Sequence, residues 1–182
     1  GLYIGIYKQC QKKWQKVVKV IDNFLDKKYF EQIQKTMLGD FFPWYYNSCI
    51  TNHKDTEDNF YFTHNFYNNI QSKTLHPGPA SNYYNLIINF LKQLKCNSII
   101  RVKGNLYLNK NKKQIHQYHT DFTFKHKGCL LYINDNNGFT YFEKEKVKPK
   151  PNRAVFFDPS KDHASSLPTD SNRRVNINVN YF

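Results

Sequence analysis

The second half of the chain is a series of short β-type runs, and this pattern restricts the fold more than any other feature of the sequence. The runs are rich in β-branched and aromatic residues and span residues 98–108, 115–121, 128–134, 140–143, 153–158 and 173–182. Turn residues separate them, and Asn136-Asn137-Gly138 predicts a tight hairpin between two of the runs. Such a set of short strands predicts a β-sandwich or a jelly-roll barrel.

The first half of the chain has helical periodicity instead. Residues 17–37 fit a short strand followed by an amphipathic helix, and residues 81–94 fit a second helix with Ser81 at its N-cap. No internal repeat or flexible linker divides the 182 residues, of which 40% are hydrophobic and available for a core. We therefore expect one mostly β domain of α+β class over residues 1–182. Residues 1–97 would supply supporting helices and the first strands, and residues 98–182 the core of the barrel.

The charge balance favours anionic partners. Lys and Arg number 27 against 14 Asp and Glu, which gives a formal net charge of +13 at pH 7. Such a field attracts nucleic acids, anionic surfaces or acidic small molecules. Many lysines stand among asparagines, as in residues 109–113, where a solvated loop is the simpler interpretation. The charge therefore permits a nucleic-acid partner without requiring one.

The cysteines and the first residues argue against several other classes. Cys10, Cys49, Cys96 and Cys129 form no Cys-x-x-Cys pair, which disfavours a zinc ribbon and a dense disulfide framework. A reducing compartment, the cytoplasm, is therefore expected. The apolar start at residues 1–7 is short and soon followed by lysines, so neither a signal peptide nor a membrane span is predicted.

His119-Thr120-Asp121 is the strongest candidate for a chemical site. In a strand, residues two positions apart share a face, so His119 and Asp121 can reach one metal ion. His163, on a later strand, can supply a third ligand. Two imidazoles and one carboxylate on one face of an octahedron leave open positions, the arrangement of non-haem iron(II) enzymes. The remaining histidines lack this spacing and are interpreted as surface or structural residues: His53, His64, His76, His116 and His126.

The last expected strand carries a row of polar residues on one face. Arg174, Asn176, Asn178 and Asn180 alternate with apolar residues. An edge strand with a solvated outer face would explain this row, and so would the polar lining of a pocket. Inside a barrel, the guanidinium of Arg174 would form a bidentate pair with a carboxylate, and Arg173 is its rival for that role.

In combination, these residues resemble the 2-oxoglutarate- and iron(II)-dependent oxygenase superfamily, whose motif is His-x-Asp, a distal His and a basic residue soon after it. His119, Asp121 and His163 match the iron ligands of that family. Arg174 with Asn176 matches the Arg-x-Ser/Asn pattern by which the family binds the far carboxylate of 2-oxoglutarate. The resemblance is specific because all of these elements occur together in one order.

Further stretches extend the resemblance over nearly the whole chain. Residues 101–107 are similar to the strand before the first ligand in prolyl-hydroxylase-like and phage-encoded members, where an inward tyrosine binds 2-oxoglutarate. Tyr107 matches that tyrosine. Residues 42–46, 136–138 and 152–158 continue the likeness, which is nearest to phage and other viral members of unassigned substrate.

The resemblance implies a fold, a set of cofactors and a class of reaction. The fold is a double-stranded β-helix, a cupin-like barrel with the metal at its mouth. The cofactors are Fe(II), 2-oxoglutarate and O2, with ascorbate as a candidate reductant. The implied enzyme is a non-haem iron dioxygenase that hydroxylates an unactivated C–H bond. For a viral chain, the expected compartment would be the host cytoplasm.

The substrate stays open at this point. The prolyl-hydroxylase-like resemblance favours a side chain of a protein or peptide. The basic charge and the aromatic residues Trp44, Tyr45 and Tyr46 allow oxidation of a nucleobase in DNA or RNA, and free small molecules are a third class. A non-enzymatic, cupin-like binding module is an alternative of a different kind. Zinc hydrolysis is a further alternative, although the sequence has no His-Glu-x-x-His helix.

Overall fold

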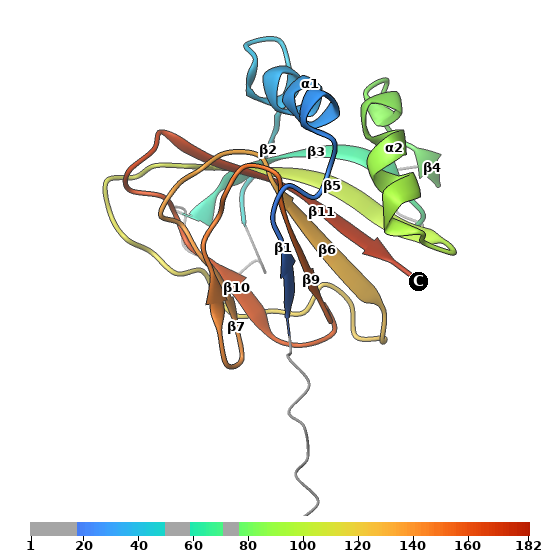
Figure 1. Ribbon diagram of the computed structural model, residues 1–182. Coiled ribbons are helices and arrows are strands. Elements are labelled where there is room, and N and C mark those ends of the chain that lie inside the picture. Colours follow the sequence, from blue (N-terminus) through green and yellow to red (C-terminus); the bar gives the residue numbers. More distant parts are fainter. Residues whose placement is uncertain (1–17, 50–58, 71–76) are drawn as a thin grey trace, which may run out of the picture.

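Two antiparallel sheets make up most of the computed structural model, which describes residues 18–49, 59–70 and 77–182 (Figure 1). The strands are β1 (Lys19–Ile21), β2 (Tyr45–Asn47), β3 (Tyr61–Asn68), β4 (Gly78–Pro79), β5 (Ile99–Leu108), β6 (Lys127–Tyr132), β7 (Thr140–Phe142), β8 (Lys146–Val147), β9 (Arg153–Phe157), β10 (His163–Ser165) and β11 (Arg173–Tyr181). The large sheet has the order β1-β9-β6-β11-β5-β3-β2, with β4 paired to β3. The small sheet has the order β10-β7-β8.

Two helices cover one face of the large sheet, and the small sheet lies on its other side (Figure 1). The first, α1 (Lys27–Leu38), begins after Asp26, whose carboxylate accepts a hydrogen bond from the N–H of Tyr29 at 3.0 Å. This helix and β1 before it confirm the order predicted for residues 17–37. The fold class is therefore as expected, mostly β with supporting helices.

The second helix, α2 (Tyr84–Leu94), was predicted, but Ser81 is not its N-cap. The residue before the helix is Tyr83, which makes no side-chain cap hydrogen bond. Ser81 lies one turn earlier, where its carbonyl accepts from the N–H of Tyr84 at 3.0 Å. Its hydroxyl accepts from the N–H of Tyr83 and also bonds the ring of His64. Ser81 therefore stabilises the turn that leads into the helix.

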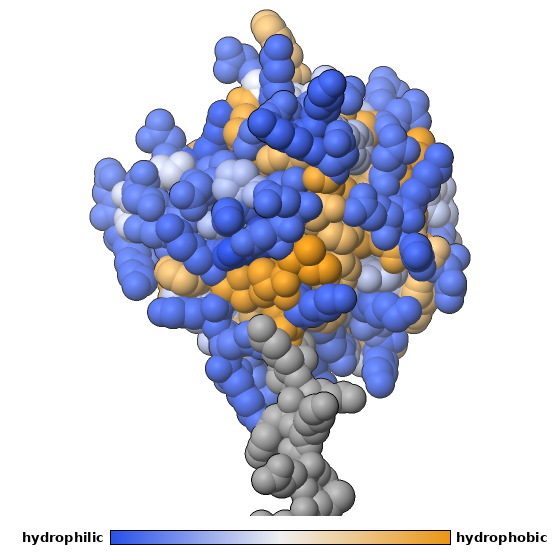
Figure 2. Space-filling model, viewed as in Figure 1, coloured by the Kyte–Doolittle hydropathy of each residue, from blue (hydrophilic) through white to orange (hydrophobic). Residues whose placement is uncertain are grey.

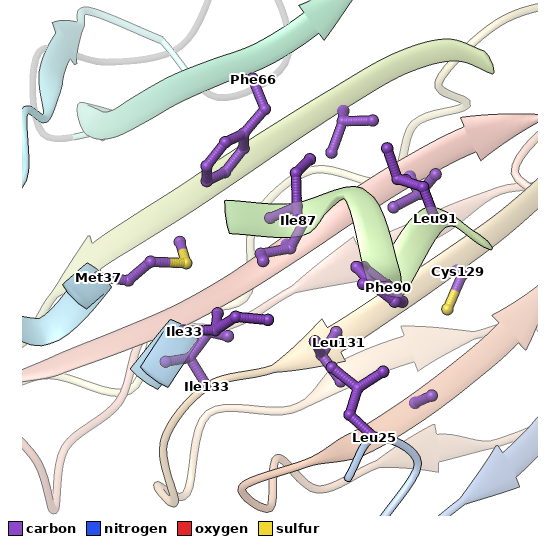
Figure 3. Packing of buried hydrophobic residues seen from close by; sticks show 14 of the residues in the cluster. Leu25, Ile33, Met37, Phe66, Ile87, Phe90, Leu91, Cys129, Leu131 and Ile133 are labelled. Atoms are coloured by element: carbon purple, nitrogen blue, oxygen red, sulfur yellow. The ribbon is translucent and has the colours of Figure 1, made fainter. Parts of the chain in front are cut away.

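The main core lies between the helices and the large sheet. Ile33 and Met37 of α1 and Ile87 and Phe90 of α2 recur at helical spacing and are fully buried. Figure 3 shows these side chains where they meet residues of the sheet, among them Leu131 of β6. The helices thus bury the apolar face of the large sheet, and the opposite face points toward the small sheet (Figure 1).

The strand predicted over residues 115–121 is wrong. This segment makes only isolated bridges, between Ile115 and Ser166 and between His119 and His163. At the second bridge, each histidine N–H donates to the other histidine's carbonyl at 3.0 Å. His119 is therefore held by this bridge to β10, and Asp121 by a backbone hydrogen bond from its N–H to the carbonyl of Pro159 at 2.9 Å, rather than by a continuous ladder.

The hairpin predicted at residues 136–138 is also wrong, because β6 and β7 lie in different sheets. The turn carries the chain from one sheet to the other. The side-chain oxygen of Asn136 accepts from the N–H of Gly138 at 3.0 Å. A Cβ on Gly138 would lie 2.8 Å from the carbonyl of Ser166 and 2.9 Å from Cδ of Arg174. The glycine therefore allows this crossing to pack directly on Arg174.

The surface seen in Figure 2 is mostly hydrophilic, and the cysteines of the described residues are free thiols. Figure 2 shows that hydrophilic residues cover most of this face, with a smaller hydrophobic area in its middle. Within the described ranges, neither helix has the length and apolar character that a membrane crossing requires. Cys49, Cys96 and Cys129 are free thiols, and Cys10 lies outside the described residues.

Candidate metal centre

Three side chains of metal-ligating type converge between the two sheets. His119 and Asp121 come from the segment between β5 and β6, and His163 is the first residue of β10. One ligand atom from each of the three lies within 4.8 Å of the others. The ring centroids of His119 and His163 are 4.6 Å apart. The backbone bridge between the two histidines thus places both imidazoles beside the carboxylate.

Backbone carbonyls orient both imidazoles in the same way. Nδ1 of His119 lies 3.3 Å from the carbonyl of Gln117, and Nδ1 of His163 lies 2.9 Å from that of Lys161. A carbonyl accepts only, so Nδ1 carries the proton and Nε2 is left as the ligand atom. Burial and the nearby His163 lower the pKa of His119 below its ordinary value. The neutral imidazole, the form that binds a metal, is therefore favoured.

A set of polar side chains holds the carboxylate of Asp121. The amides of Asn178 and Asn180 donate to Oδ2 at 3.0 and 2.8 Å, and Nη2 of Arg101 donates to Oδ1 at 3.2 Å. Burial by itself would raise the pKa of Asp121, but Arg101, His163 and the two amides outweigh it and hold the pKa well below its usual range. Asp121 is therefore an ionised and oriented oxygen donor, and together with the two imidazoles it makes a ligand set that fits iron(II).

A buried guanidinium lies in the same cavity, which has a volume of about 50 Å³. Arg174 is 1% exposed, and its Nη2 donates to the hydroxyl of Thr140 at 2.7 Å. Its charged group lies over the rings of Tyr107 and Tyr132, at 5.2 and 5.8 Å from their centroids. Nε and Nη1 find no hydrogen-bond partner among the described residues. Unused donors on a buried cation fit an anionic ligand such as a carboxylate.

Tyr107 and Asn176 line the cavity beside Arg174. The amide of Asn105 donates to the side-chain oxygen of Asn176 at 3.0 Å, which fixes both groups. Burial raises the pKa of the Tyr107 hydroxyl, so this group stays protonated and is a donor. Arg173, the rival of Arg174, lies outside the cavity, and its Nη2 donates to the carbonyl of Leu38 at the end of α1 at 2.7 Å.

The histidines interpreted as structural make hydrogen bonds where they are described. His64 contacts the carbonyl of Pro43 at 2.8 Å, and His116 contacts the hydroxyl of Ser165 at 2.8 Å. His126 lies 3.2 Å from the amide of Asn180. None of these three joins the metal cluster, and His53 and His76 lie outside the described residues.

Two basic residues of the site were not assigned from the sequence. Arg101 and Lys103 both lie on β5, where they alternate with Val102 and share a face with Tyr107. Lys103 lines the cavity, and Arg101 reaches the site through its bond to Asp121. The signal was the period of two along residues 101–107, which matches the polar row of the last strand. Read as a pair, the two alternations would have indicated a polar face across neighbouring strands.

Comparisons of the sequence with protein-family models and with curated proteins find no match. Solved structures do match, over almost the whole chain. A viral collagen prolyl hydroxylase from Paramecium bursaria chlorella virus-1, in a 2-oxoglutarate complex, is 17% identical, with 91% of this chain and 96% of that chain covered and a TM-score of 0.55. An oxidoreductase of the 2OG-Fe(II) oxygenase family from Burkholderia pseudomallei is 11% identical, with 91% and 84% covered and a TM-score of 0.62.

A third match is a prolyl hydroxylase from Trichoplax adhaerens, in complex with a peptide fragment of the oxygen degradation domain of hypoxia inducible factor. It is 12% identical, with 92% of this chain and 84% of that chain covered and a TM-score of 0.58. At these identities the likeness is one of fold. The chain has the double-stranded β-helix fold of the 2-oxoglutarate- and iron(II)-dependent oxygenases, with a His-Asp-His cluster between its two sheets.

Proposed function

We propose that the chain is a 2-oxoglutarate- and iron(II)-dependent dioxygenase that hydroxylates an unactivated C–H bond. One observation carries the proposal: an iron-type ligand set shares its cavity with a buried guanidinium whose donors are unused by the described residues. When bound, iron(II) and 2-oxoglutarate supply the oxidising chemistry, with O2 as oxidant and ascorbate as a candidate reductant. The protein itself would bind and orient these groups and exclude water from the site.

The side chains divide into two groups by role. His119, Asp121 and His163 would hold the metal, and the carbonyls and amides behind them fix the direction of each ligand atom. Arg174 would bind the far carboxylate of 2-oxoglutarate, with the Tyr107 hydroxyl as a further donor. Asn176 lies between the two groups on the same face of β11. Both ends of the cosubstrate would thus meet a fixed partner.

A protein or peptide side chain is the proposed substrate. The support is the fold shared with prolyl hydroxylases, one of which was solved with a peptide fragment bound. The barrel itself does not encode the substrate, because the surrounding loops select it in folds of this kind.

A nucleobase is the second candidate. The net charge of +13 favours a polyanion, and Tyr45 and Tyr46 on β2 are 63% and 62% exposed. Trp44, the third aromatic residue of this stretch, instead packs on Phe42 with 5.0 Å between ring centroids. Two exposed rings on a strongly basic chain are therefore the specific support for this alternative.

Turnover tests the proposed function directly. The chain is incubated with iron(II), 2-oxoglutarate and ascorbate in air, and succinate is measured in the presence of peptide pools or of single-stranded oligonucleotides. We expect release stimulated by peptides and a mass gain of one oxygen atom on the peptide. Stimulation by oligonucleotides alone would select the second candidate. His163→Ala is the control, and succinate at the level of that variant under all conditions would contradict an oxygenase.

A further inference from the structure

Lys103 is a cation of the cavity that the proposed function does not use. It lies on β5 opposite Asn178 of β11, and Asn178 donates to the metal-ligand carboxylate of Asp121. Tyr107, opposite Arg174, stands four residues further along β5, which is about 13 Å of strand. Lys103 therefore belongs to the metal end of the cavity, and Arg174 belongs to its other end.

The ammonium group of Lys103 has no carboxylate partner within ion-pair distance in the described part of the chain. Asp121, the nearest acidic residue of the cavity, is paired with Arg101 instead. The one hydrogen bond of Lys103 runs from Nζ to the hydroxyl of Tyr61 at 3.2 Å. Since an ammonium carries three donors, two of them are available to a ligand.

Tyr61 supplies a second donor at the same place. Its hydroxyl accepts from Lys103, so its own proton is free to donate elsewhere. Burial raises the pKa of Tyr61, which keeps the hydroxyl protonated. The ring is stacked on that of Tyr107, with centroids 5.5 Å apart and planes 14° from parallel. Two fixed neighbouring donors match the two oxygens of one carboxylate.

Of the three basic side chains described at the site, Lys103 is the one left without a paired negative charge when 2-oxoglutarate is bound. Arg101 is paired with Asp121, and the far carboxylate of 2-oxoglutarate would neutralise Arg174. Burial and the nearby Arg101 lower the pKa of Lys103 to about 7, so keeping this amine charged is unfavourable without an anion beside it. A bound anion would remove that penalty. A phosphate would need more donors than these two, whereas a carboxylate does not.

We propose that Lys103 and Tyr61 form a carboxylate-binding site at the metal end of the cavity, and that the substrate carries the carboxylate held there. Assigning the carboxylate to a substrate rests on the proposed oxygenase function. The near carboxylate of 2-oxoglutarate has the same chemistry and is the other source. The substrate class would be acidic: a side chain or molecule with a carboxylate close to the oxidised carbon.

Paramagnetic relaxation with Mn(II) in the metal site tests the inference. The methyl protons of acetate relax faster when acetate binds near the ion, and neutral acetamide is the matched probe. We expect faster relaxation for acetate and no change for acetamide. The affinity for acetate should be about tenfold weaker in Lys103→Met, since a charged hydrogen bond is lost. Tyr61→Phe keeps the stacked ring and should weaken acetate binding by about threefold. Lys92→Met, on the exposed side of α2, removes an equal charge far from the cavity and should change nothing.

Repeating the measurement with saturating 2-oxoglutarate distinguishes a carboxylate of the substrate from the near carboxylate of 2-oxoglutarate. Enhancement that persists assigns the site to the substrate. If 2-oxoglutarate abolishes the enhancement and itself binds more weakly to Lys103→Met, the cosubstrate occupies the site and the substrate assignment is overturned. Wild-type behaviour of Lys103→Met toward both ligands would overturn the whole inference. Water-proton relaxation reports separately whether Mn(II) binds. Without metal binding, saturation transfer from the metal-free chain to acetate must still show the same loss in Lys103→Met.

Discussion

The two faces of β11 are equally buried and carry opposite kinds of side chain. Val175, Ile177 and Val179 point toward the helices and are 0% exposed. Arg174, Asn176, Asn178 and Asn180, on the other face, are between 0% and 7% exposed. Parallel sheets that are covered on both faces have strands that are apolar throughout, and this antiparallel strand is not. A strand that buries a polar face must satisfy that face by other means.

Part of the polar face is satisfied within the protein, and part of it is not. The amides of Asn178 and Asn180 bond Asp121, and Asn176 accepts from Asn105. Two nitrogens of Arg174 lack partners among the described residues. Each such buried group costs about 1–3 kcal/mol of stability. The apolar face toward the helices therefore stabilises the fold, whereas the polar face toward the cavity keeps unpaired donors that a ligand can use.

The largest expected effect is on the apolar face. Ile177→Ala should lower the free energy of unfolding by about 2–5 kcal/mol, because it opens a cavity in the main core. Urea denaturation measures this change. Ile115→Ala is the matched control, since that side chain is 49% exposed and should contribute far less. A loss at Ile177 no greater than at Ile115 would break the distinction between the two faces.

The next effect separates binding from stability on the polar face. Arg174→Met should weaken 2-oxoglutarate binding by about 10- to 100-fold, because a charge-assisted pair is lost. The free energy of unfolding should stay equal or rise, since an unpaired buried charge is replaced by an apolar side chain. Calorimetric titration and urea denaturation measure the two quantities. Arg173→Met should bind 2-oxoglutarate normally, and weakened binding in that variant alone would exchange the two assignments.

A smaller effect is expected where the polar face supports Asp121, the proposed metal ligand. Asn178→Ala removes one amide from Oδ2 of Asp121 and should weaken iron(II) binding by about tenfold. Asn180 still holds the same oxygen, so binding should not be abolished. Asn172→Ala, at an exposed position just before β11, is the control for a titration with iron(II) under argon. Unchanged affinity in Asn178→Ala would mean that the amides do not orient the carboxylate.

The smallest effect lies outside both faces, at the end of β1. Asp22 accepts from Nε of Arg153 at 2.6 Å and from Lys150 at 3.3 Å, and its side chain is 37% exposed. The hydrogen bond from Arg153, helped by the one from Lys150, lowers the pKa of Asp22 from 3.8 to about 2. Because the folded pKa is the lower one, the stabilisation is present above pH 4 and is lost as the pH falls toward 2.

Asp22→Asn should therefore lower the free energy of unfolding by no more than about 1 kcal/mol at neutral pH, since water and salt screen an exposed pair. The difference from the wild type should shrink between pH 4 and pH 2, as followed by denaturation at each pH. A difference that grows in that range would contradict the direction of the pKa shift.

The features that the sequence predicted were those with a local pattern. The alternation at 173–182 and the His-x-Asp spacing are visible in a few consecutive residues, and helical periodicity located both helices. The bridge between His119 and His163 was not visible, because it joins short segments far apart in the chain. β3 was missed because its aromatic and polar residues do not alternate by hydropathy. The place of residues 136–138 depends on the pairing of sheets rather than on the turn residues.

The most direct test of the metal centre is an anaerobic titration of the metal-free chain with iron(II) and 2-oxoglutarate, followed by visible absorption. We predict a charge-transfer band of the iron chelate in the wild type and its loss in His119→Ala, in which one of the three clustered ligands is removed. Absence of both the band and metal binding in the wild type would contradict an oxygenase. The barrel would then be a cupin-like binding module without a metal.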